Sequence, residues 1–90
     1  MYVVRLSLDA QADLRLLRRN LPQAFKKVTR LLSELEEHPR TGTGQVEQLK
    51  YCTNETWSRR ITREHRLVYE IHESEVLVLV ISAYGHYESS

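Results

Sequence analysis

The aliphatic run from Val76 to Ala83 constrains the fold more than any other segment of this 90-residue chain. The run carries no charge, yet it is too short to cross a bilayer, so we expect no membrane-spanning segment. A near-continuous aliphatic run of this length is typical of a strand that is covered on both faces. We therefore expect a buried strand at 76–83, close to the carboxyl end of a soluble protein.

The amino-terminal part of the chain changes its hydrophobic period. Residues 2–8 alternate as a strand does, and Ser7 or Asp9 can then cap a helix. Two helical stripes follow, separated by Pro22, which is well placed to open the second helix. We expect an antiparallel pair of helices that ends at His38-Pro39. The stripes are Ala10, Leu14, Leu17 and Leu21, and then Phe25, Val28, Leu32 and Leu35.

Beyond a Gly-containing loop at 41–44, the remaining segments all have the character of strands. We expect strands at 46–51, 57–61, 66–71 and 76–83, which gives the order β-α-α-β-β-β-β. Ninety residues leave no room for a second core, so we expect residues 1–90 to form a single domain. The fold class is α+β, with a helical hairpin packed on one face of a mainly antiparallel twisted sheet.

Composition sets limits on the cellular setting and on the chemistry. Cys52 is the only cysteine, so an intramolecular disulfide is excluded and a cytoplasmic protein is expected. The four histidines lack the usual ligand spacings, and we therefore expect no metal or other cofactor. Thirteen basic against twelve acidic side chains give a net charge of +1, which alone argues against nucleic-acid binding.

The distribution of charge contradicts this average. Basic residues share a face on each expected helix, and four arginines fall within eight residues of the expected 57–71 hairpin, whereas most acids lie at a helix end or a turn. Phosphate contacts depend on the local field, so this surface is a candidate for binding RNA. Alternatively, the helices merely display solvated charges. The basic residues are Arg15, Arg18, Arg19, Lys26, Lys27, Arg30, Arg59, Arg60, Arg63 and Arg66.

The register of the hairpin sharpens this interpretation. If the turn centres on Glu64, then Arg60 and Arg66 lie nearly opposite each other on the face that points away from the helices. Two like charges this close destabilise a sheet unless an anion lies between them. The alternative is that a nearby carboxylate, Glu47, Glu64 or Glu70, neutralises them within the protein.

Residues 42–50 and 57–69 resemble the YoeB/Txe branch of the RelE toxin superfamily. The two segments read Gly-Thr-Gly-Gln-Val-Glu-Gln-Leu-Lys and Trp-Ser-Arg-Arg-Ile-Thr-Arg-Glu-His-Arg-Leu-Val-Tyr, and the resemblance extends to the pair His86-Tyr87. Residues 1–41 agree only in length and helix pattern. The resemblance implies a RelE-like fold and the activity of a ribosome-dependent mRNA endoribonuclease from a type II toxin–antitoxin pair, which cleaves in the ribosomal A site.

Carried over residue by residue, the family pattern implies a catalytic set of Glu47, Arg66, His86 and Tyr87. RNA cleavage by side chains alone needs a base, an acid and cations for the developing charge; Glu47, His86 and Arg66 match these roles. Lys50 and the basic residues named above would contact RNA. The chain departs from the family in having Val46 and Gln48 for prolines, Asn54-Glu55 for Ser-Gly, and a tail at 88–90.

The resemblance also implies partners. These are mRNA, the ribosome, an antitoxin of the YefM/Phd kind that folds over the helices as it binds, and a second copy of the chain as a homodimer. Two other functions stay open. The chain could be a non-catalytic RNA- or ribosome-binding module, or a protein-interaction subunit of the same fold.

Overall fold

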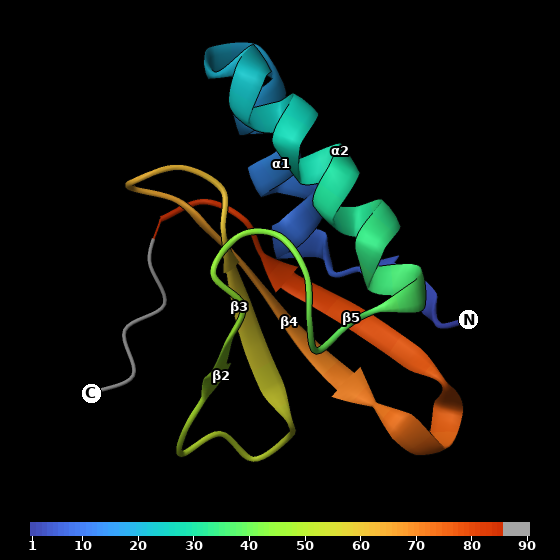
Figure 1. The fold of residues 1–90 in the computed structure, drawn as a ribbon. Helices are drawn as coiled ribbons and strands as arrows, with labels where there is room; N and C mark the ends of the chain where they lie inside the picture. The colour runs from blue at the N-terminus through green and yellow to red at the C-terminus, as the bar shows by residue number, and fades with distance from the viewer. Residues whose placement is uncertain (86–90) are drawn as a thin grey trace.

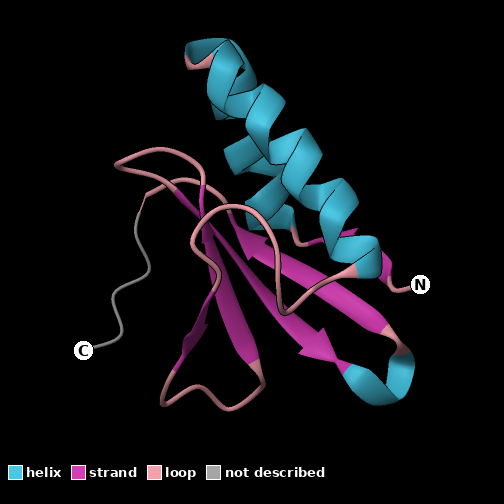
Figure 2. Cartoon of the chain, in the orientation of Figure 1, coloured by secondary structure: helices cyan, strands magenta, loops and turns pink. Residues whose placement is uncertain are grey.

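The computed structural model describes residues 1–85, and these form two α-helices packed on one face of a five-stranded sheet (Figures 1 and 2). This arrangement confirms the predicted α+β class and order of elements. The strands are β1 (Val3–Leu6), β2 (Glu47–Leu49), β3 (Thr56–Arg60), β4 (Arg66–His72) and β5 (Leu77–Ser82); the α-helices are α1 (Leu8–Asn20) and α2 (Pro22–Glu37), and a 3₁₀ turn, η1 (Glu73–Glu75), joins β4 to β5.

The sheet has the spatial order β1-β5-β4-β3-β2. β1 pairs with β5 in parallel, with Val3 opposite Leu77, and every other pair is antiparallel. The first strand of the chain therefore lies beside the last. The sheet is mainly antiparallel, as the sequence predicts, and the helical hairpin lies over only one of its faces (Figure 1).

The two helices begin where the sequence predicts. The Ser7 side chain accepts a hydrogen bond from the Ala10 amide, which makes Ser7 rather than Asp9 the cap of α1. Pro22 is the first residue of α2, where its missing amide hydrogen costs nothing. Only Leu21 separates the helices, so they run antiparallel (Figure 1).

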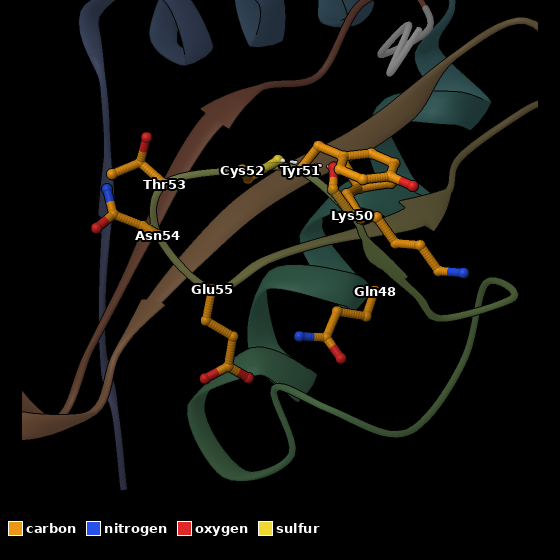
Figure 3. Close-up of a pocket in the computed structure, with 8 residues that line it drawn as sticks. Gln48, Lys50, Tyr51, Cys52, Thr53, Asn54 and Glu55 are labelled. Carbon is orange, nitrogen blue, oxygen red and sulfur yellow. Dashed lines mark hydrogen bonds between the residues drawn. The ribbon is translucent and has the colours of Figure 1, made fainter.

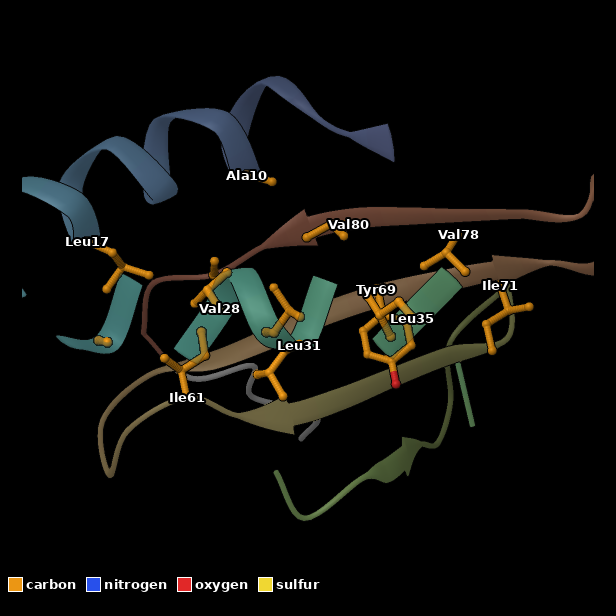
Figure 4. Packing of buried hydrophobic residues seen from close by; sticks show 13 residues of the cluster. Ala10, Leu17, Val28, Leu31, Leu35, Ile61, Tyr69, Ile71, Val78 and Val80 are labelled. Carbon is orange, nitrogen blue, oxygen red and sulfur yellow. The ribbon is translucent and has the colours of Figure 1, made fainter. Parts of the chain in front are cut away.

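The core lies between the helices and the sheet (Figure 4). Leu17 from α1, Leu31 from α2 and Val80 from β5 are fully buried there. The expectation that the aliphatic run at 76–83 is covered on both faces is wrong: Val78 and Val80 are buried, but Leu77, Leu79 and Ile81 are only partly covered. Two helices suffice to cover one face of the sheet, and no α-helix of residues 1–85 covers the other.

The β3–β4 hairpin has the predicted register. Arg60 is the partner of Arg66, and Trp57 is the partner of Tyr69. Because side chains alternate along a strand, Ser58 and Arg60 point to the face away from the helices, while Trp57 and Arg59 point toward them. We call the first of these surfaces the open face.

Candidate functional site: a carboxylate and two arginines on the open face

Glu47 and Arg66 meet at one serine on the open face. Glu47 in β2 is the register partner of Ser58 in β3, and such partners have their side chains on the same face about 5 Å apart at Cβ. Ser58 Oγ in turn accepts a hydrogen bond of 3.0 Å from Arg66 Nε. The candidate base and the candidate phosphate ligand, 19 positions apart in sequence, therefore lie beside the same hydroxyl.

The loop before β2 holds both arginines of the open face. The carbonyl of Gln45 accepts a hydrogen bond of 3.0 Å from Arg66 Nη2, and its side-chain Oε1 accepts one of 3.4 Å from Arg60 Nη1. The carbonyl of Gly44 also accepts from the Arg60 amide. Gly44 has a φ of 97°, and a Cβ there would lie 2.9 Å from the carbonyl oxygen of Arg60, so only glycine allows this approach.

Arg60 and Arg66 are not neutralised by a carboxylate of the described residues. Their hydrogen-bond partners are neutral oxygens, and no salt bridge of residues 1–85 includes either of them. Glu70, one of the carboxylates considered for this role, contacts His72 instead. Within residues 1–85 neither guanidinium is held in an ion pair, so both can bind an anion on adjacent strands.

The prediction that Arg59 contacts RNA is wrong for this structure. Arg59 is 0% exposed and lies on the side of the helices. Its guanidinium donates to Glu34 Oε1 at 2.8 Å, to the Thr41 carbonyl at 2.7 Å and to the carbonyls of His38 and Thr43, while its Nε donates to Tyr69 Oη at 3.0 Å. All of these acceptors lie within the protein. Arg59 therefore holds the 38–43 loop, which leads to Glu47, against the sheet.

This buried network also has a clear electrostatic effect. A hydrogen bond from the Thr43 amide, helped by the charge of Arg59, holds the pKa of the Glu34 carboxyl below its usual value. Burial raises the pKa of the Tyr69 hydroxyl, which Arg59 opposes only in part. Glu34 is therefore ionised and Tyr69 neutral at physiological pH, which fits their roles as acceptors for Arg59.

The other predicted basic residues do not form one continuous surface. Those of the helices lie in the layer on the opposite side of the sheet from Glu47 and Arg66 (Figure 1). Lys50, directly after β2, and Arg63, in the β3–β4 turn, are both exposed at the sheet. The helical residues are Arg15, Arg18, Arg19, Lys26, Lys27 and Arg30, all exposed except the partly covered Lys27.

The described chain ends against the strand that carries Arg66. The Arg66 amide donates to the Gly85 carbonyl at 3.0 Å, and the Gly85 amide donates to His65 Nδ1 at 2.8 Å. The ring of Tyr84 lies 4.2 Å from that of His65, between centroids. His86 and Tyr87, predicted to be catalytic, follow in the sequence and lie outside the described residues.

Three of these contacts were not anticipated from the sequence. Ser58 accepts from Arg66 beside Glu47, Gln45 in the loop before β2 accepts from both arginines, and His65 accepts from Gly85. Strand alternation carries a signal for Ser58, since it shares a face with Arg60. Nothing in the sequence singles out Gln45, because its role depends on a left-handed φ of 51° and a backbone carbonyl.

Residues 1–85 contain no group of three or more His, Cys, Asp or Glu side chains that is arranged to hold a metal ion. Within the same range, no helix is long and apolar enough to cross a membrane.

Comparison with known proteins decides the family. A family described as "YoeB-like toxin of bacterial type II toxin-antitoxin system" matches residues 6–87 of the chain. The chain belongs to this YoeB-like toxin family. This YoeB-like toxin resembles Toxin YoeB of Escherichia coli K12, with 42% identity over 53 residues, and Toxin YoeB of Synechocystis, with 38% identity over 69 residues.

The extent of these matches differs between the relatives. The match to the E. coli toxin covers 59% of this YoeB-like toxin and 63% of the relative, so the chain spans less than two thirds of the length of that relative. The match to the Synechocystis toxin covers 77% and 78% of the two chains.

Solved structures confirm that the fold is that of the family. The YoeB/ParE toxin from Agrobacterium tumefaciens superposes with a TM-score of 0.86 at 32% identity, covering 94% of this YoeB-like toxin and 99% of that chain. The toxin of the YoeB–YefM complex from Staphylococcus aureus superposes with a TM-score of 0.79 at 30% identity, covering 97% and 99%.

Proposed function

We propose that this YoeB-like toxin is an endoribonuclease that cleaves mRNA on the ribosome. The observation that carries this proposal is that Glu47 and Arg66 both lie beside Ser58, with Arg60 directly opposite Arg66. The Glu47 carboxylate can accept a proton, and the two neighbouring guanidiniums can bind a phosphodiester.

In the proposed reaction, the Glu47 carboxylate takes the proton of a ribose 2′-hydroxyl. The 2′-oxygen then attacks the adjacent phosphorus, and the bond to the 5′-oxygen breaks. His86 gives its proton to that leaving oxygen, so the products are a 2′,3′-cyclic phosphate and a 5′-hydroxyl. Arg66 binds the non-bridging oxygens as charge develops on them, and Tyr87 belongs to the same set.

The exposure of Glu47 explains why we place the reaction on the ribosome. Glu47 is exposed to water in the protein alone. RNA held over the open face would cover Glu47 and exclude water from it. A ribosome that aligns the message supplies the orientation that this shallow site lacks, and the basic helices are free to contact ribosomal RNA.

The decisive experiment is induced expression followed by mapping of mRNA 5′ ends. Wild type should produce new 5′ ends at ribosome-bound positions, whereas Glu47→Gln, Arg66→Gln and His86→Gln should lose them. Glu36→Gln, an exposed carboxylate on α2, is the matched control and should cleave as wild type does. An mRNA with a single 2′-deoxyribose at the cleavage position should resist wild type.

The same variants distinguish the other functions. If all three catalytic-set variants keep wild-type toxicity and bind ribosomes, the chain is a non-catalytic RNA-binding module. If none of the proteins binds ribosomes and the chain purifies only with another protein, it is a protein-interaction subunit.

We further propose that a YefM/Phd-type antitoxin neutralises the chain and that two copies can associate. Relatives support this: one solved structure is a YoeB–YefM complex and another a YoeB dimer, both from Staphylococcus aureus. Co-expression with a protein encoded next to the toxin gene, followed by light scattering of the purified complex, tests both. An antitoxin should abolish cleavage at equimolar amounts.

A further inference from the structure

Tyr51 is a large aromatic residue that the protein leaves almost entirely uncovered. It is the second residue after β2, four positions after Glu47, and is 96% exposed. No hydrogen bond, ring contact or ion pair within residues 1–85 involves its side chain. Single exposed apolar residues are common on protein surfaces, so exposure alone carries no conclusion.

The backbone conformation of Tyr51 is unusual for a tyrosine. Its φ is 64°, in the left-handed region that bulky side chains rarely adopt and that glycine or asparagine occupies at less cost. A hairpin loop of this kind is where glycine would be expected. Tyrosine here is therefore unfavourable to folding, since its backbone is strained and its ring, 96% exposed among the described residues, adds little packing in return.

The surroundings of Tyr51 place its ring beside the proposed site. The residues from Gln48 to Glu55 line a hollow of about 410 Å³, and the side chains of Lys50 and Tyr51 project to the same side of it, away from Asn54 (Figure 3). Tyr51 also borders a hollow of about 380 Å³ with Thr56 and Glu70. Thr56 is two residues before Ser58 on β3, so this second hollow lies over the open face.

We propose that Tyr51 and Lys50 form a subsite that stacks on one nucleobase of the RNA and binds an adjacent phosphate. This inference rests on the proposed RNA cleavage. Tyr51 is four positions after Glu47, a distance of at most about 14 Å along an extended chain, so the stacked base belongs to a nucleotide close to the cleaved bond. Aromatic rings bind single-stranded RNA by stacking on unpaired bases, and a neighbouring cation binds the backbone.

Trp57, the aromatic residue on the β3 side of this hairpin, is not available for such a role. Trp57 is partly buried against the core, and its indole N–H donates to Glu55 Oε2 at 2.8 Å. Tyr51 has no comparable role in the fold, which leaves its ring free to bind a ligand.

The test compares Tyr51→Ala, Tyr51→Phe and Tyr51→Gly in the full-length toxin. For cleavage of ribosome-bound mRNA, Tyr51→Ala should raise KM about tenfold with a smaller change in kcat, and Tyr51→Phe should behave as wild type, because stacking needs the ring and not the hydroxyl. Leu8→Ala, at a residue of α1 that is 82% exposed, is the control and should leave KM unchanged.

Tyr51→Gly separates a binding role from a structural one. It should raise the midpoint of urea unfolding, because glycine tolerates the left-handed backbone, and yet raise KM as much as alanine does. If Tyr51→Gly unfolds at a lower urea concentration than wild type, the ring supports the fold and the proposal is wrong.

A second arm uses a short RNA oligonucleotide with all its bases and the same oligonucleotide with abasic positions. Base removal should weaken binding to wild type about tenfold and leave binding to Tyr51→Ala almost unchanged, as expected when the two changes delete the same contact. Equal losses for both proteins would overturn the subsite. Loss of cleavage in wild type itself would instead contradict the proposed function.

Discussion

His65 accepts a hydrogen bond at Nδ1 from the amide of Gly85, while the next residue, Arg66, donates its own amide to the Gly85 carbonyl. Gly85 is thus held on both sides by the start of β4. This pair of bonds fixes Gly85, the last described residue, against the start of the strand that carries Arg66.

We predict that His65→Phe lowers the rate of mRNA cleavage about fivefold. Phenylalanine keeps a ring against Tyr84 but offers no acceptor to the Gly85 amide, and one hydrogen bond of this kind is worth about 1 kcal/mol. The rate at saturating ribosomes is the measurement. Tyr84→Phe keeps both the ring and the bond, so it serves as the control and should retain full activity.

Replacing Arg60 should stabilise the free protein. Its charge lies opposite that of Arg66, and like charges in such a pair destabilise a sheet by about 0.2–1 kcal/mol. Arg60→Gln should therefore raise the midpoint of urea unfolding at low ionic strength, and about 1 M salt should remove the difference by screening. Arg63→Gln, in the exposed turn, is expected to change little; an equal gain there would mean that net charge is the cause.

Arg59→Met should destabilise the fold by about 3 kcal/mol. The variant leaves Glu34, Tyr69 and the carbonyls of the 38–43 loop without the donor that serves them all, and breaking a buried ion pair from one side is strongly unfavourable. Urea unfolding with an unchanged m-value measures the loss. Glu34→Gln keeps an oxygen for the Thr43 amide and should lose less; a larger loss would contradict this account.

Acid should unfold the protein through a cluster around Arg40. Hydrogen bonds from Arg40 hold the pKa of the Glu55 and Glu73 carboxyls below their usual values, and Arg40 also contacts Tyr2. Because these groups have lower pKa values folded than unfolded, the stability that they contribute is present above about pH 4.3 and is lost as pH falls through the folded values.

The matched variant for this prediction is Arg40→Met. It should be less stable than wild type at neutral pH, and its stability should fall less steeply between about pH 5 and pH 3, since the two carboxyls then titrate closer to their ordinary range. Urea unfolding at a series of pH values gives both results. Arg30→Met, on the exposed side of α2, should keep the wild-type slope.

The order of elements follows from the spacing of the apolar residues. A strand buries every second residue and a helix buries residues three or four apart, so each change of spacing marks the start of a new element. Ser7 and Pro22 mark the starts of the helices by their local chemistry, which does not depend on the rest of the fold. The covering of the 76–83 strand could not be predicted in this way. Its aliphatic pattern is compatible with burial on both faces, but two helices cover only one.

Some contacts of the candidate site can be predicted from the sequence, and others depend on the folded loop. The opposition of Arg60 and Arg66 follows from turn position and alternation alone. The direction of Arg59 toward the helices follows from the same alternation, since Arg59 lies between Trp57 and Ile61 in sequence. Its positive charge favours an exposed position instead, and the prediction that Arg59 contacts RNA rests on that charge. The link from Arg66 to the Gln45 carbonyl depends on a loop conformation that no side-chain pattern encodes.

The parallel pairing of β1 with β5 determines when this protein can complete its fold. The Val3 amide bonds to the Val76 carbonyl and β1 pairs with residues 77–80, so this strand has no sheet partner until the chain has been made through residue 80. Until then the apolar faces of α1 and α2 lack the β5 surface that they cover. Synthesis of the last strand is thus the step that closes the sheet, and the interval before it is when the nascent chain is most open to chaperones, proteases and early-binding partners.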